Sequence, residues 1–144
     1  MKLLIINGPN LNMIGIRNKE IYGSMSYKDL CINIKRYASS FNHSVKFYQS
    51  NHEGKIIDFI QKNYNKFDGY IVNLGAYTHY SYAIRDALEI VKAPIVEVHL
   101  SDIASREDFR KISVISDIVK ERFYGEGIKS YEKAIDFLGN LSWI

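Results

Sequence analysis

The stretch LLIINGPN, residues 3–10, is an apolar run that ends in turn-forming polar residues. A short apolar run bounded in this way is typical of a strand buried in a sheet. Residues 70–72 precede Asn73 in the same manner, and residues 95–98 precede His99. The three stretches therefore predict the central strands of a parallel α/β sheet.

Helical patterns alternate with these strands along the whole chain. Further strands are expected at residues 44–50 and 122–124, and helices at residues 27–41, 56–64, 81–91, 106–111 and 134–141. Ala83, Ala87 and Ile90 should face the core. Alternation of this kind implies a parallel sheet with right-handed crossovers. Fold economy favours a flavodoxin-like α/β fold, a five-stranded parallel sheet of order 2-1-3-4-5 with helices on both faces.

Composition limits the classes of protein that fit. The 144 residues show no linker or repeat, which predicts a single domain over residues 1–144. The apolar runs are far shorter than the roughly 20 residues that cross a bilayer. A net charge of +3, spread along the chain, argues against a nucleic-acid partner. A strand at residues 1–7 leaves no room for a signal peptide, so we expect a cytoplasmic protein.

Polar side chains follow three of the predicted strands, at residues 7–22, 73–79 and 97–101. Ligands of open α/β sheets bind beyond the carboxyl ends of the strands, near the point where the strand order reverses. In the order 2-1-3-4-5, strands 1 and 3 flank that point and strand 4 lies beside strand 3. The sequence therefore predicts a reaction site at this edge.

Other interpretations of the first polar stretch are a plain turn or a nucleotide site. Asn7 to Asn10 are ordinary turn formers. No Walker motif and no Gly-x-Gly-x-x-Gly fingerprint follows the first strand. A non-enzymatic module that binds a nucleotide or flavin remains the alternative.

Arg17 and Tyr22 lie in a loop bounded by Gly15 and Gly23. The pair could be a solvated arginine and a packed tyrosine. A guanidinium beside a phenol favours the phenolate, however, and the pair would then supply a base on a mobile loop.

Glu97 and His99 are two residues apart on a strand, so both side chains point to the same face. A carboxylate beside an imidazole fixes its tautomer and favours the protonated form. The pair is either a buried ion pair or a catalytic acid. Arg106 and Arg110, expected on one face of a short helix, could clamp an anionic or polyhydroxylated ligand. The histidines lack metal-ligand spacing, so we expect no metal.

Several motifs together resemble the type II 3-dehydroquinate dehydratases over nearly the whole chain. In chain order they are NGPNLN at 7–12, GxR at 15–17, YG at 22–23, QSNHEG at 49–54, NxGxxTH at 73–79, RDA at 85–87, EVHxS at 97–101 and RExFR at 106–110.

This resemblance implies a flavodoxin-like subunit that removes water from 3-dehydroquinate to give 3-dehydroshikimate, without metal or organic cofactor. By position, Tyr22 would take a proton from C2, and Arg17 would favour its phenolate. Asn10 would hold a water that stabilises the enolate. His99, oriented by Glu97, would protonate the departing C1 hydroxyl.

The resemblance also implies the substrate contacts and the assembly. Asn73, Leu100 and Ser101 match positions that bind the substrate carboxylate, and His79 and Arg110 match contacts to ring hydroxyls. Arg106 matches a contact of the lid, the loop that carries Arg17 and Tyr22. Asp86 matches a residue that reaches a neighbouring subunit, in trimers that associate into a dodecamer. On one helix with His79 it would lie about 10 Å away, so we expect it to serve a neighbouring site, with Arg17 as its candidate partner.

The chain departs from the family pattern at three places. Asn18-Lys19 stands where Glu-Pro is frequent, Gly75-Ala76 replaces a Gly-Gly pair, and Ser130 replaces a glycine. An inactive scaffold related to the dehydratases is a third possibility, but the matches at Tyr22, Arg17 and His99 argue against it.

Overall fold

Five parallel strands form the centre of the fold, in the order β2-β1-β3-β4-β5. The computed structural model describes residues 1–17 and 19–141. The strands are β1 (Lys2–Asn7), β2 (Ser44–Gln49), β3 (Gly69–Asn73), β4 (Ile95–His99) and β5 (Glu121–Tyr124). The predicted α/β class, the parallel arrangement and the strand order are all confirmed.

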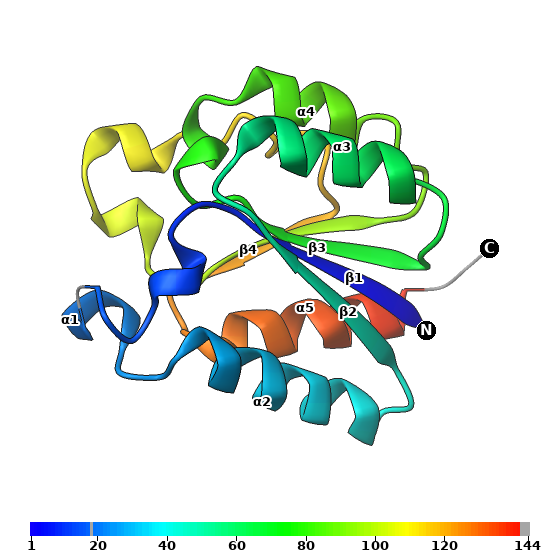
Figure 1. Ribbon diagram of the computed structural model, residues 1–144, viewed down its shortest axis with the longest axis horizontal. Coiled ribbons are helices and arrows are strands. Elements are labelled where there is room, and N and C mark those ends of the chain that lie inside the picture. The colour runs from blue at the N-terminus through cyan, green and yellow to red at the C-terminus, as the bar shows by residue number, and fades with distance from the viewer. Residues whose placement is uncertain (18, 142–144) are drawn as a thin grey trace.

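Helices cover both faces of the sheet (Figure 1). They are α2 (Tyr27–Ser40), α3 (Glu53–Asn63), α4 (Tyr82–Leu88) and α5 (Ile128–Asn140), with one short helix α1 (Lys19–Tyr22) in the first loop. Successive side chains of a strand point to opposite faces. Leu3 and Ile5 of β1 accordingly pack with α2 and α5, whereas Leu4 and Ile6 pack with α3 and α4.

Hydroxyl caps set where two helices begin. The Ser26 hydroxyl accepts a hydrogen bond from the Asp29 backbone N–H at 3.1 Å, and this N-cap starts α2. Ser81 does the same for the Ile84 N–H at 3.1 Å and starts α4. The cap at Ser81 separates α4 from the 3₁₀ helix Gly75–His79. His79 and Asp86 therefore do not share one helix, and that expectation was wrong.

The core-facing side of α4 also differs from the prediction. Ile84, Ala87 and Leu88 are buried, whereas Ala83 and Ile90 are exposed. The helix ends at Leu88, so Ile90 lies beyond its last turn. Ile84, Ala87 and Leu88, at positions i, i+3 and i+4, form the apolar face of α4 that packs into the core.

The predicted helix at residues 106–111 was wrong in type. Two 3₁₀ helices, Ile103–Ser105 and Asp108–Lys111, occupy this part of the chain. Arg106 lies between them in an extended conformation, with φ −95° and ψ −160°. Its side chain therefore leaves the backbone in a direction that no continuous helix would give.

The departure at Asn18-Lys19 is only partly within the structure. Asn18 lies outside the described residues, and Lys19 begins α1. Among the described residues, no helix combines the length and the apolar character needed to span a membrane.

Candidate active site

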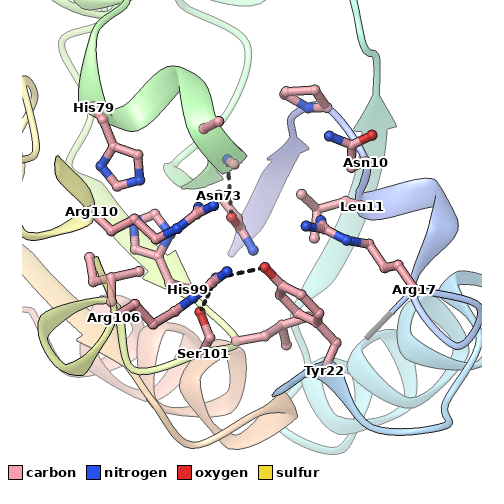
Figure 2. A pocket seen from close by; sticks show the side chains of 15 residues that line it. Asn10, Leu11, Arg17, Tyr22, Asn73, His79, His99, Ser101, Arg106 and Arg110 are labelled. Atoms are coloured by element: carbon pink, nitrogen blue, oxygen red, sulfur yellow. Dashed lines mark hydrogen bonds between the residues drawn. The ribbon is translucent and has the colours of Figure 1, made fainter. Parts of the chain in front are cut away.

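A cavity of about 120 Å³ opens at the carboxyl ends of β1, β3 and β4. Figure 2 shows Asn10 and Arg17 on one side and His79 and Arg110 on the other, with the Tyr22 hydroxyl pointing between them. The lining comprises Pro9, Asn10, Leu11, Arg17, Tyr22, Asn73, Gly75, Ala76, His79, His99, Leu100, Ser101, Ile103, Arg106 and Arg110. Ten of the twelve predicted site residues belong to it; Glu97 and Asp86 do not.

The loops after β1 and β3 interlock to form one wall. The Gly8 N–H donates to the Asn73 carbonyl at 2.7 Å. A Cβ on Gly8 would lie 2.3 Å from the Leu74 oxygen, and one on Gly75, which has φ +58°, would lie 2.9 Å from the Pro9 oxygen. Gly75 thus permits the close approach of the loop that follows β1.

Asn10 adopts the left-handed conformation, with φ 70°. Its backbone N–H donates to the Asn51 side-chain oxygen at 3.0 Å. Gln49 donates to that same oxygen at 3.2 Å and to the Gly8 carbonyl at 3.1 Å. Non-glycine residues held in this region cluster at functional sites, where surrounding contacts must fix them. The motif at 49–54 therefore supplies the brace that holds Asn10 at the cavity.

Two arginines contact Tyr22, which ends α1. Arg106 donates to the Tyr22 hydroxyl at 2.8 Å and to the Ser101 hydroxyl at 3.3 Å. The Arg17 guanidinium lies over the tyrosine ring, 4.4 Å from its centroid. The predicted neighbourhood of Arg17 and Tyr22 is present, but the hydrogen bond to the oxygen comes from Arg106.

Glu97 lies beneath His99 and is fully buried. His99 Nε2 is 2.9 Å from Glu97 Oε2, and Arg122 Nε donates to the same oxygen at 3.0 Å. The Ser113 hydroxyl donates to Glu97 Oε1. Burial alone would raise the pKa of Glu97. The hydrogen bond and charge of His99, together with Ser113 and Arg122, outweigh burial and hold that pKa below its ordinary value.

An ionised Glu97 accepts hydrogen bonds only, so His99 directs its Nε2–H to it. Nδ1 is then the nitrogen that remains for a ligand. The same-face geometry predicted from the strand is present.

His79 and Arg110 lie across the cavity from Asn10. The His79 Nδ1 is 2.7 Å from the Ile112 carbonyl, which leaves Nε2 for the cavity. Burial lowers the pKa of His79, and the charges of His99 and Arg110 act in the same direction. His79 is therefore neutral near pH 7. Arg110 is held by Glu107, whose Oε2 accepts from its Nε at 2.6 Å.

A buried polar network forms the floor of the cavity. Asn73 Nδ2 donates to the Tyr131 hydroxyl at 2.9 Å, and that hydroxyl donates to Asn7 Oδ1 at 2.6 Å. Asn7 Nδ2 donates in turn to the Tyr27 hydroxyl at 3.2 Å. Burial raises the pKa of both phenols well above its ordinary value, so both stay protonated. The network fixes which end of the Asn73 amide carries the oxygen.

Asp86 is exposed on α4 and is absent from the lining that the described residues form. Sequence reasoning did not find Tyr131, Arg122 or Ser113, because each is far from its partner in the chain and carries no local motif. Glu97 and Arg122 are partners in the register of β4 and β5, and the predicted neighbourhood of these two strands was the available signal for Arg122.

The arrangement suits proton transfer near an oxyanion. A phenol flanked by two guanidinium groups and an imidazole backed by a carboxylate face one cavity, with Arg110 and Ser101 beside them. Among residues 1–17 and 19–141, no three His, Cys, Asp or Glu side chains gather as a metal site would require.

Comparisons with known proteins agree with one another. The profile of the family described as Dehydroquinase class II matches residues 1–139. A 3-dehydroquinate dehydratase of Caldicellulosiruptor bescii is 55% identical over 131 residues, which cover 90% of each chain. One from Thermotoga maritima is 49% identical over 96% of this chain and 94% of its own.

Solved structures give the same result. The type II dehydroquinase of Butyrivibrio crossotus superposes with a TM-score of 0.94 and 52% identity, covering 97% of this chain and 98% of its own. A 3-dehydroquinate dehydratase-like protein of Bifidobacterium longum gives a TM-score of 0.72 at 25% identity, over 99% of each chain.

Proposed function

The chain belongs to the class II dehydroquinase family, and from this premise we propose that it removes water from 3-dehydroquinate with Tyr22 as the base and His99 as the acid. The ketone at C3 of that substrate makes the neighbouring C2 proton acidic. A base, an enolate stabiliser and a general acid are then sufficient for an anti elimination.

Tyr22 takes the C2 proton in its phenolate form. The hydrogen bond from Arg106 and the guanidinium of Arg17 over the ring both favour that form. The electrons of the C2–H bond move onto the C3 oxygen and give an enolate. Asn10, held at the cavity by Asn51, binds the water that stabilises this oxygen.

His99 completes the elimination. It gives the Nδ1 proton to the C1 hydroxyl, the C1–O bond breaks, and the enolate electrons form the C1=C2 double bond. Water and 3-dehydroshikimate leave, and solvent returns a proton to His99 and removes one from Tyr22. Glu97 orients the imidazole through Nε2.

The remaining lining residues hold the substrate. Leu100, Ser101 and Asn73 bind its carboxylate. The orientation of the Asn73 amide is fixed because its Nδ2 donates to the Tyr131 hydroxyl. Neutral His79 and Arg110 contact ring hydroxyls. Arg106, held between Tyr22 and Ser101, closes the lid loop over the site.

A neighbouring subunit completes the site. We assign Asp86 to that role because it is exposed on α4 and lies away from its own cavity. Trimers would bring it to the lid arginine Arg17 of an adjacent copy and then associate into a dodecamer. Neither a metal nor an organic cofactor takes part.

One observation carries the proposal: Tyr22, flanked by Arg106 and Arg17, and His99 line one small cavity (Figure 2). Glu97 backs His99 from behind the lining. The test is to add 3-dehydroquinate and follow the ultraviolet absorbance of the conjugated enone product. Absence of turnover, together with a nucleotide or flavin retained by the purified protein, would instead support a binding module.

Two variants test the roles separately. Tyr22→Phe keeps the ring and should remove nearly all elimination and all exchange of the C2 proton with solvent. His99→Ala should cripple elimination more than exchange, because exchange needs only the base and the enolate stabiliser. If both reactions fall equally in His99→Ala, then His99 acts in binding and is not the acid.

A further inference from the structure

Arg122 of β5 lies directly opposite Glu97 of β4 in the register of the two strands. Its Nε donates to Glu97 Oε2 at 3.0 Å, and its side chain is 28% exposed while that of Glu97 is fully buried. Opposite charges on neighbouring strands attract one another, and the register of β4 and β5 places these two residues side by side. The carboxylate that backs the proposed acid thus has a second, permanent cation.

Two nitrogen donors share one oxygen of Glu97. His99 Nε2 and Arg122 Nε are both within 3.0 Å of Glu97 Oε2, and the Ser113 hydroxyl occupies Oε1. The guanidinium keeps its charge at every working pH, whereas the imidazole loses its charge each time it acts as an acid. Arg122 therefore offsets part of the negative charge that would otherwise retain the proton on His99.

We propose that Arg122 is a positioning residue for the elimination: it fixes Glu97 in the orientation that presents His99 and weakens the hold of that carboxylate on the imidazole proton. The role rests on His99 being the general acid. It predicts that Arg122 affects the departure of the C1 hydroxyl and leaves removal of the C2 proton alone.

Other charged groups near the pair come from separate elements. His79 of the 3₁₀ helix Gly75–His79 interacts electrostatically with both members of the pair, and Arg110 of Asp108–Lys111 interacts with His79. Tyr22 and Arg106 also line the cavity beside His99, but Tyr22 is the proposed base and Arg106 is hydrogen-bonded to it. Arg122 differs from all of these because it lies behind the carboxylate and outside the cavity lining.

The experiment compares Arg122→Met with Arg122→Lys and with Arg36→Met, which removes an exposed arginine of α2. In Arg122→Met, loss of the offsetting charge should lower kcat for elimination about tenfold and move the alkaline limb of its pH profile up by about one unit. KM and C2 exchange should change less than about twofold. In Arg122→Lys, the alkaline limb should return most of the way to the pH at which the parent protein shows it. Arg36→Met should match the parent. Equal losses of elimination and exchange, or an unmoved limb, would overturn the proposal.

A His99→Ala background separates this inference from the proposed acid. If His99 is the acid, adding Arg122→Met there should change nothing further. If His99→Ala itself keeps the parent rate and alkaline limb, the acid assignment fails.

Folding is controlled by a second comparison. Arg122→Met leaves a buried carboxylate short of one partner, so Glu97→Gln with Arg122→Met serves as a neutral pair of similar shape. If the single variant unfolds, the test moves to the double variant against Glu97→Gln alone. Removing Arg122 in the Glu97→Gln background should still move the alkaline limb to higher pH, because the guanidinium charge also acts directly on the imidazolium. An alkaline limb that does not move in this comparison would overturn the mechanism.

Discussion

Tyr22 is contacted by two arginines in different ways, and the difference predicts unequal effects on the base. A hydrogen bond to an ionised oxygen stabilises it directly, whereas a guanidinium over a ring face is worth about 0.5–2 kcal/mol and acts on the neutral phenol as well. Arg106 makes the first kind of contact and Arg17 the second.

Arg106→Ala should therefore move the acid limb of the kcat profile to higher pH by about one unit or more, and Arg17→Ala should move it less. Elimination rates measured across pH 5–10 give both limbs. Arg36→Ala serves as the surface control. A larger shift in Arg17→Ala would mean that the lid closes differently when substrate is bound and that Arg17 then reaches the oxygen.

Residue identity was predictable where a local rule applied and unpredictable where distant segments meet. The two-residue period of a strand placed Glu97 and His99 on one face. No local rule connects Arg106 to Tyr22, 84 residues apart, because the contact depends on the extended backbone between two 3₁₀ helices. Tyr131 was one aromatic among many until the fold placed it under Asn73.

Loops between elements are fixed as tightly as the elements themselves. Gly8 follows β1 and has no room for a Cβ, since one would lie 2.3 Å from the Leu74 oxygen. Within residues 1–17 and 19–141, a Cβ on Gly54, in the first turn of α3, would meet no atom within 4 Å apart from its own helix and chain neighbours. The two glycines form a matched pair for the same substitution.

Gly8→Ala should lower the free energy of unfolding by about 2 kcal/mol or more and also displace Asn10 from the cavity, reducing activity. Gly54→Ala should leave activity unchanged and stabilise the protein by up to about 1 kcal/mol, because alanine is the better helix former. Urea unfolding and turnover, measured together, check both. A Gly8→Ala protein of full activity would show that the interlocked loops do not position the site.

At the level of elements, apolar runs predicted the three central strands, and hydrophobic patterns predicted β2, β5 and the helices α2, α3, α4 and α5, although α5 begins earlier than expected. Hydrophobic periodicity failed at residues 106–111, where Asp102 accepts from the Ala104 N–H at 3.1 Å to begin the first of two 3₁₀ helices. It also did not show that the cap at Ser81 separates His79 from α4. Such caps involve about three residues, whereas a hydrophobic pattern can be recognised only over a longer segment.

For the whole molecule, the assembly prediction concerns Asp86. Asp86→Ala should weaken both trimer formation and activity, while Lys35→Ala, exposed on α2, should affect neither. Sedimentation equilibrium and turnover at the same protein concentration test this. A fully active monomer would exclude a shared site.

Stability should fall as the solution becomes acidic, in two stages. The pKa values of His79 and Glu97 are both lowered in the folded protein, so the unfolded chain binds more protons. The His79 contribution is complete above its unfolded pKa of about 6.5 and is lost as pH falls below that value. The Glu97 contribution is complete above about 4.3 and is lost below it.

Urea midpoints from pH 8 to pH 3, at fixed protein concentration, follow both stages. Glu97→Gln should flatten the second stage and leave the first in place. A midpoint that stays constant between pH 7 and pH 3 would contradict the linkage.

The buried network under Asn73 has a consequence for the order in which the protein matures. The Tyr131 hydroxyl on α5 and Asn7 at the end of β1 are 124 residues apart, so the floor of the cavity joins segments from nearly opposite ends of the chain. Contacts of such sequence separation form late, since the loop-closure entropy precedes any gain. A nascent chain that has emerged only to Gly127 therefore carries every cavity-lining side chain yet lacks the floor beneath them. The ordered cavity of the single chain should arise in one step when α5 docks, which limited proteolysis of stalled ribosomal complexes of increasing length would reveal.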